Sequence, residues 1–189
     1  MSLNSEIIRE TVRVLRNGGI ILYPTDTIWG LGCDATNSEA VKRIYRIKKR
    51  DDSHSMLVLL DTQSRLSYYV KEIPDIAWQL LDVADSPLTL IYPGARNIAP
   101  ELIAEDGSLG IRITDDHFCS EMIARLKKPL VSTSANISGE PAPLSYLDIS
   151  EQVKESADYI VPLRQDETNE KTASSIIKIE IDGQFKIIR

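Results

Sequence analysis

The first residues whose types and spacing suggest chemistry follow a short apolar run at residues 20–23. Thr25, Asp26 and Thr27 place two hydroxyls and a carboxylate just beyond that run, after a proline that interrupts it. A buried strand is expected to end here. In open α/β sheets, ligands bind beyond the carboxyl ends of the strands. The position therefore indicates a ligand site.

The same segment has a simpler interpretation as a turn. Thr and Asp side chains after a proline commonly satisfy the amides of their own loop. Gly30 and Gly32 follow closely, and glycines near a strand exit indicate a backbone that turns sharply or approaches another group. The residues alone leave both interpretations open.

A second polar cluster repeats this design later in the chain. Ser132, Thr133, Ser134 and Asn136 follow a short apolar run at residues 129–131. Hydroxyl-rich turns that cap their own amides are again the alternative. Two such clusters, each at a strand exit, are harder to explain as turns together than singly.

A lysine on the apolar side of a predicted helix is the third feature. Residues 38–48 are predicted to be helical, with Val41 and Ile44 on the buried side. Lys48 lies four residues after Ile44 and seven after Val41, so the helical period places it on that side too. A buried ammonium without a partner is unfavourable. We therefore expect Lys48 to reach a pocket that contains an anion.

An arginine inside a predicted strand completes the set. Residues 108–114 alternate with a period of two, which places Arg112 on the opposite face from Ile111 and Ile113. Cations and a carboxamide suit oxygen anions, and hydroxyls suit amino and carboxyl groups. Together the four features predict a site for phosphates and a small polar substrate. The sequence contains neither a Walker loop nor a G-x-G-x-x-G motif, so a nucleotide would be held differently.

The elements that must position these side chains alternate between strand and helix. Helices are predicted from residue 4 or 5 to the Gly18-Gly19 pair and at 38–48, 64–69, 74–84, 117–126 and 147–156. Strands are predicted at 20–23, 56–60, 88–92, 108–114, 129–131, 159–163, 174–179 and 185–189, the last two joined by an Asp-Gly turn. This order predicts an α/β domain with a mixed, twisted sheet.

Length and composition set limits on the class of protein. A chain of 189 residues with 42% hydrophobic residues fits one globular domain. The net charge of −6 argues against a protein dedicated to non-specific nucleic-acid binding. Two distant cysteines indicate neither a disulfide framework nor a zinc site. No signal peptide or membrane-spanning stretch is recognised, and a cytoplasmic location without membrane association is expected.

Four segments together resemble the YrdC/YciO family, in the single-domain form of a threonylcarbamoyl-AMP synthase. They are YPTDTIWGLGCDA, the Lys48-x-Arg50 pair, LGIRIT and STSANISGEPAP, in this order. The resemblance extends from the first helix to Arg189. It implies one YrdC-like domain over residues 1–189, with an open, twisted mixed sheet, flanking helices and a large, positively charged concave cavity.

The resemblance also implies an activity. Members of this family make threonylcarbamoyl-AMP and pyrophosphate from L-threonine, bicarbonate and ATP, a nucleotidyl transfer that begins threonylcarbamoyladenosine formation in tRNA. Mg²⁺ is expected to accompany ATP. The expected partners are these small molecules, a tRNA threonylcarbamoyl transferase complex that receives the product, and RNA bound weakly.

The family pattern assigns roles to nine residues of this sequence. Threonine binding is implied for Thr25, Arg112, Ser134 and Ser174, with Arg112 taking the carboxylate. Nucleotide binding is implied for Lys48, Arg50, Ser108, Asn136 and Arg189, and Lys48 and Arg50 would also be catalytic at the ATP phosphates.

The sequence departs from the family pattern in two segments. The family commonly has prolines and an Asn-Pro-Leu sequence after the motif arginine, where residues 51–56 read DDSHSM, and residues 84–89 read ADSPLT in place of Trp-Pro-Gly-Pro-Leu-Thr. These departures favour a YciO-like paralogue with weak or different activity as an alternative. An RNA-binding module that uses the cations of residues 42–50 is another.

Overall fold

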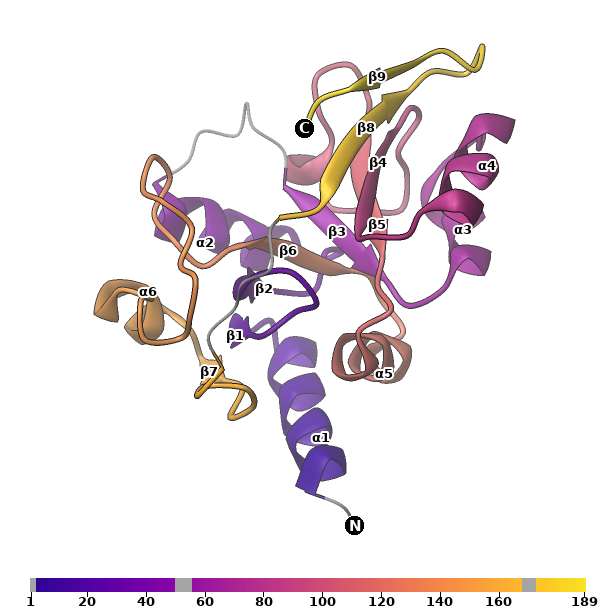
Figure 1. The fold of residues 1–189 in the computed structure, drawn as a ribbon. Coiled ribbons are helices and arrows are strands. Elements are labelled where there is room, and N and C mark those ends of the chain that lie inside the picture. Colours follow the sequence, from indigo (N-terminus) through magenta and orange to yellow (C-terminus); the bar gives the residue numbers. More distant parts are fainter. Residues whose placement is uncertain (1–2, 50–55, 168–172) are drawn as a thin grey trace.

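The computed structural model describes residues 3–49, 56–167 and 173–189, which form an α/β fold around one mixed sheet (Figure 1). The strands are β1 (Ile21–Tyr23), β2 (Gly30–Gly32), β3 (Leu57–Leu60), β4 (Leu88–Tyr92), β5 (Leu109–Ile113), β6 (Leu130–Ser134), β7 (Tyr159–Ile160), β8 (Ser175–Ile179) and β9 (Phe185–Ile187). Their order is β7-β1-β2-β6-β3-β5-β4-β8-β9. Strand pairs β1–β7, β3–β5 and β4–β8 are parallel and the other neighbours are antiparallel. The predicted mixed open sheet is confirmed.

Helices flank the sheet on both faces. They are α1 (Leu3–Arg16), α2 (Ser38–Lys48), α3 (Leu66–Tyr69), α4 (Asp75–Val83), α5 (His117–Leu126) and α6 (Glu151–Ser156), with 3₁₀ turns η1 (Gln63–Arg65) and η2 (Pro100–Leu102). The bounds of α2 and α5 match the prediction. Asn37 caps α2, because its side chain accepts a hydrogen bond from the amide of Ala40. In the part of the chain that the structure describes, no helix has the length and apolar character needed to cross a membrane.

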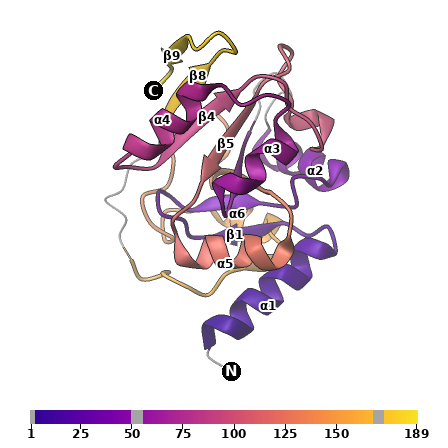
Figure 2. The same cartoon turned by 90° about the vertical axis from the view of Figure 1, so that its right-hand side faces the viewer.

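Two apolar cores lie on opposite faces of the sheet, and β3 shows the division. Val58 and Leu60 belong to a large core that includes side chains of α2, α3 and α4. Leu59 belongs to a smaller core beneath α1 and α5, which pack against each other (Figure 2). Since successive strand residues point to opposite faces, Leu57 shares the face of Leu59. Leu57 lines a cavity there, so this face is divided between two helices and an open site.

Strand β2 was not predicted, and it shows why the first polar segment contains glycines. It pairs antiparallel with both β1 and β6. A Cβ atom at Gly32 would lie 2.8 Å from the ring of Tyr23 and 2.8 Å from the carbonyl oxygen of Val131. Gly32 thus lies at a close backbone approach, which was one of the two predictions for these glycines. The other prediction, a sharp turn, was wrong at this position.

The ends of several other elements differ from the prediction; β7, for example, ends at Ile160 and not at residue 163. Strand β6 continues to Ser134 instead of ending at Val131, because pairing with β2 and β3 supplies partners for a polar segment that looked like a loop. Helix α6 begins at Glu151 and not near Leu147. The preceding residues form a turn in which the Asp148 carboxylate accepts hydrogen bonds from the amide and hydroxyl of Ser145.

The C-terminal hairpin is confirmed. Strands β8 and β9 pair antiparallel, and Gly183 in the connecting turn has φ +86°, a conformation that favours glycine. Arg112 also has the predicted orientation, since it lines the cavity while Ile111 joins the large core on the opposite face. The alternation of hydrophobic and other residues therefore predicted both features correctly.

The close approach at Gly32 predicts a specific destabilisation. Gly32→Ala should lower the free energy of unfolding by about 1–3 kcal/mol, because the new methyl group overlaps a backbone oxygen that cannot move away freely. Gly110→Ala is the matched control, since a Cβ there would lie 3.5 Å from the Cβ of Leu57, an ordinary contact. Chemical denaturation measures both. Equal stability of the two variants would contradict the packing argument.

Candidate functional site

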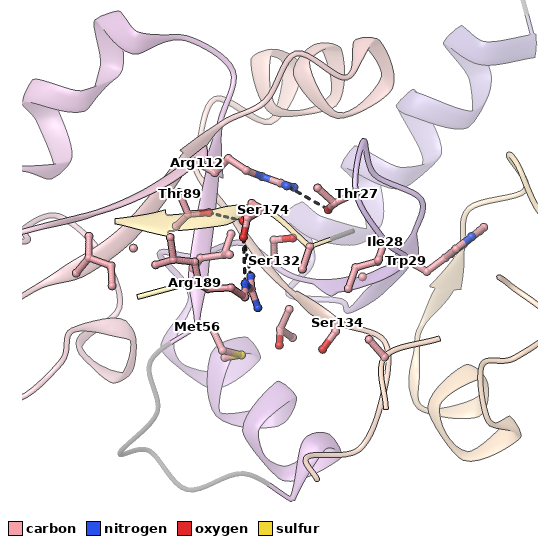
Figure 3. A pocket seen from close by; sticks show the side chains of 18 residues that line it. Thr27, Ile28, Trp29, Met56, Thr89, Arg112, Ser132, Ser134, Ser174 and Arg189 are labelled. Atoms are coloured by element: carbon pink, nitrogen blue, oxygen red, sulfur yellow. Dashed lines mark hydrogen bonds between the residues drawn. The ribbon is translucent and has the colours of Figure 1, made fainter. Parts of the chain in front are cut away.

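A cavity of about 300 Å³ opens on the face of the sheet that α1 and α5 leave uncovered (Figure 3). Residues from β2, β3, β4, β5, β6 and β8 form its floor and walls. Among the described lining residues two are arginines, six carry hydroxyls and none is acidic. They are Thr27, Ile28, Trp29, Gly30, Met56, Leu57, Thr89, Ile91, Gly110, Arg112, Ser132, Thr133, Ser134, Ala142, Ala173, Ser174, Ile176 and Arg189. This lining suits a small polar anion.

Arg112 supplies a buried positive charge to the cavity. Its side chain is only 3% exposed, and Nη2 lies 3.0 Å from Oδ1 of Asp26. Nη1 donates a hydrogen bond of 3.1 Å to Oγ1 of Thr27 (Figure 3), whereas Nε has no hydrogen-bond partner among the described residues. A buried guanidinium requires partners, so Arg112 ties the first polar segment to the centre of the sheet.

The hydroxyl of Thr25 is used inside its own turn. It donates to the carbonyl oxygen of Ile28 at 2.7 Å and accepts from the amide of Thr27 at 3.0 Å. Because its proton goes to Ile28, the 2.9 Å contact between the two threonine hydroxyls has Thr27 as donor. A directional chain therefore runs from Arg112 through Thr27 to Thr25. Thr27 lines the cavity, and Thr25 is buried behind it.

Tyr23 orients a second hydroxyl. Burial raises the pKa of Tyr23, so the phenol keeps its proton. It donates that proton to Oγ of Ser132 at 2.9 Å. Ser132 lines the cavity. Since its oxygen accepts from Tyr23, its own proton is directed elsewhere and is available to a ligand.

The C-terminal wall is a small hydrogen-bonded group. The hydroxyls of Ser174 and Thr89 lie 2.8 Å apart. Arg189 donates to the carbonyl oxygen of Ser174 from Nε at 3.1 Å and from Nη2 at 2.9 Å. These bonds use two of the five N–H groups of the guanidinium. The structure thus brings Arg189 and Ser174, two predicted site residues, to the same wall (Figure 3).

Lys48 is buried as predicted, with 2% of the residue exposed. Its Nζ donates to the carbonyl oxygens of Ser134 at 2.6 Å and of Asn136 at 2.7 Å. Two carbonyl oxygens therefore accept from the ammonium, and the expected anion partner of Lys48 stays a prediction. Lys48 and Asn136 do not line the cavity. They hold the end of β6, where Ser134 does line it. The side-chain amide of Asn136 donates to the carbonyl oxygen of Glu140 at 2.6 Å.

One other predicted site residue lies outside the cavity lining. Ser108 is buried outside the cavity lining and donates from its hydroxyl to Asp106 at 2.6 Å. Hydrogen bonds from Lys178 and Ser108 lower the pKa of Asp106 to about 2. Arg50 lies outside the described residues, as do Asp51 and Asp52.

Sequence reasoning missed two lining residues with suitable chemistry. Thr89 lies inside β4, and its register places it beside Arg112. Trp29 is buried and packs against Tyr146 with ring centroids 5.1 Å apart. The period of two in residues 88–92 could have placed Thr89 on one face, but only the strand pairing shows which face contains the cavity.

Comparisons with known proteins agree with this geometry. The Sua5_yciO_yrdC family model, described as "Telomere recombination", matches residues 13–189. The chain is 31% identical over 180 residues to a protein of Pseudoalteromonas translucida named threonylcarbamoyl-AMP synthase, covering 94% of this chain and 95% of that relative. A protein of the same name from Pseudomonas aeruginosa is 32% identical, covering 79% of this chain and 80% of that relative. The chain therefore belongs to the Sua5/YciO/YrdC family.

Solved structures show the same fold. Sua5 of P. abyssi complexed with L-threonine superimposes with a TM-score of 0.84 and 26% identity. The match covers 96% of this chain but 53% of that one, so this chain spans about half the length of Sua5. YciO of E. coli has a TM-score of 0.85 at 23% identity, with 100% and 90% of the two chains covered. The predicted YrdC-like fold is confirmed.

The environment of Lys48 predicts a loss of stability when its charge is removed. Lys48→Met keeps an unbranched side chain but leaves the carbonyl oxygens of Ser134 and Asn136 without this donor. The free energy of unfolding should fall by about 1–3 kcal/mol for each oxygen left unsatisfied. Lys49→Met is the control, because Lys49 is exposed and should change stability by less than about 0.5 kcal/mol. A Lys48 variant as stable as the control in urea unfolding would disprove the buried interaction.

Proposed function

We propose that the chain is an L-threonylcarbamoyladenylate synthase, a nucleotidyltransferase that uses L-threonine, bicarbonate and ATP. The observation that carries this proposal is the hydroxyl-lined cavity with the buried cation of Arg112 on its floor. An amino acid offers a carboxylate for such a cation, together with polar groups for the surrounding hydroxyls. The names of the relatives and the L-threonine held by the P. abyssi Sua5 structure support the same substrate class.

The proposed reaction has two steps. The amine of threonine and bicarbonate first form a carbamate with loss of water. A carbamate oxygen then attacks the α-phosphorus of ATP, the bond to the β-phosphate oxygen breaks, and pyrophosphate leaves with the bond electrons. The product is threonylcarbamoyl-AMP. Such transfers depend mainly on positioning and charge stabilisation.

The chain's own residues fit the positioning part of this mechanism. Arg112 would hold the threonine carboxylate, and Ser134 and Ser174 would lie beside the amino acid. Thr25 would act through the turn that presents Thr27. Arg189 would stabilise nucleotide charge from the C-terminal wall.

The remaining nucleotide residues stay predictions. Lys48 and Arg50 as phosphate ligands, and Ser108 and Asn136 as nucleotide contacts, are part of the proposal. In this structure Lys48 engages the backbone of the Ser134–Asn136 segment. For it to reach phosphate directly, that segment would have to rearrange when ATP binds.

Mg²⁺ would enter with ATP, whose phosphate oxygens and bound waters supply most of its usual ligands. The described residues contain no group of three or more His, Cys, Asp or Glu side chains that could hold a metal ion. The single domain over residues 1–189, the cytoplasmic location, weak RNA binding and product transfer to a tRNA-modifying complex also stay predictions.

The test is pyrophosphate release from ATP, Mg²⁺ and bicarbonate, measured with and without L-threonine. The double variant Arg112→Gln/Asp26→Asn removes both charges, so that neither is left buried without its partner. Losing the charge-assisted contact to the carboxylate should raise the KM for threonine roughly 10- to 100-fold. Arg125→Gln is the control, because Arg125 is exposed on α5 and is not one of the lining residues.

Two outcomes would overturn the proposal. Pyrophosphate release that is independent of threonine would exclude this reaction. ATP binding without any threonine-dependent release would favour the YciO-like alternative. A double variant that retains both its thermal midpoint and the original KM for threonine would remove Arg112 from the amino-acid site.

A further inference from the structure

A second cavity, of about 680 Å³, lies where α3, the 93–99 segment and the turn after α5 meet. None of its lining residues is shared with the first cavity. Arg65, Lys127 and Lys128 bring three cations to its wall, and every other described lining residue also carries a hydroxyl or an amide. The positive charge of this wall is a local feature, because the whole chain has a net charge of −6.

The carboxylates that balance two of these cations lie behind them. Asp61 is 2.7 Å from Arg65 and Asp34 is 2.7 Å from Lys128. Their side chains are only 10% and 5% exposed, compared with 23% for Arg65 and 50% for Lys128, and neither acid lines the cavity. The buried acids orient the cations while the surface presented to a ligand remains positive.

Lys127 occupies a backbone position that favours glycine. It is the C-cap of α5 with φ +63°, and its amide donates to the carbonyl oxygen of Ile123. Glycine is the usual residue in this left-handed conformation. A lysine at a helix C-terminus also interacts well with the helix dipole, but that effect does not account for Arg65, which comes from another element. Three cations from two separate segments therefore converge on one cavity.

An aromatic ring lies on the same rim. Tyr68 is 60% exposed, and its ring meets that of Tyr69 edge to face with centroids 5.0 Å apart. Asn97, which has φ +54°, holds this rim by donating to the carbonyl oxygen of Tyr68 at 2.8 Å. A fixed, exposed ring beside cations suits a ligand that combines an aromatic base with a phosphate.

We propose that this cavity is a second site, separate from the reaction site, that binds a nucleoside phosphate. The phosphate lies among Arg65, Lys127 and Lys128, and the base stacks on Tyr68. The nucleoside phosphate is either free in solution or a unit of single-stranded RNA, since both offer the same phosphate and base.

The test follows amide resonances of residues 64–69, 97 and 127–128 by NMR during titration of the full chain. The probes are AMP, inorganic phosphate and a short single-stranded oligonucleotide. AMP or the oligonucleotide should shift these amides, with phosphate weaker than either. Saturation by AMP identifies a free nucleotide as the source, whereas saturation by the oligonucleotide alone identifies RNA.

Lys127→Gly separates binding from folding. It removes a cation but places glycine where φ is positive, so the thermal midpoint should be unchanged or higher while affinity falls roughly tenfold. Lys49→Gly is the matched control: Lys49 is the exposed left-handed C-cap of α2, with φ +49°, and does not line this cavity. Tyr68→Ala should weaken AMP and leave phosphate unchanged. Unshifted amides with every probe, or equal affinity in Lys127→Gly, would overturn the proposal.

Discussion

The burial of the Arg112 guanidinium is the constraint on which the rest of the site depends. A charge that is 97% removed from solvent within a sheet must be compensated, and Asp26 and Thr27 provide that compensation from a segment 85 residues earlier in the chain. That pairing fixes the first polar segment over the sheet.

The surrounding groups are arranged before any ligand binds. The donor chain from Arg112 through Thr27 to Thr25 gives each hydroxyl a defined direction, and Tyr23 does the same for Ser132. Lys48 holds the second polar segment through backbone oxygens. Electrostatic catalysis benefits from such preorganised dipoles, because they need not reorient during reaction. Both cavities also pair cations with carboxylates: Asp26 contacts Arg112 in the first, and Asp61 and Asp34 contact Arg65 and Lys128 in the second.

Local pattern predicted the features that depend on a repeat. The helical period placed Lys48 on the buried side, and the strand period directed Arg112 away from Ile111. Pattern failed where a neighbouring strand decides the structure. The Gly30–Gly32 segment forms a central strand because its glycines allow Tyr23 and Val131 to approach. Polarity likewise suggested a loop after Val131, although β2 and β3 extend β6 to Ser134.

The sequence by itself determined the α/β class, most of the elements and the polar chemistry of the two site segments, because these follow from hydrophobic periodicity and residue chemistry along the chain. Only the tertiary structure decided which hydroxyls reach the cavity. It selected Thr27 for the lining where Thr25 was expected, added Thr89, and directed the Lys48 ammonium to the carbonyl oxygens of Ser134 and Asn136. These outcomes depend on strand register and on hydrogen-bond directions between residues distant in sequence, and neither is encoded in local spacing.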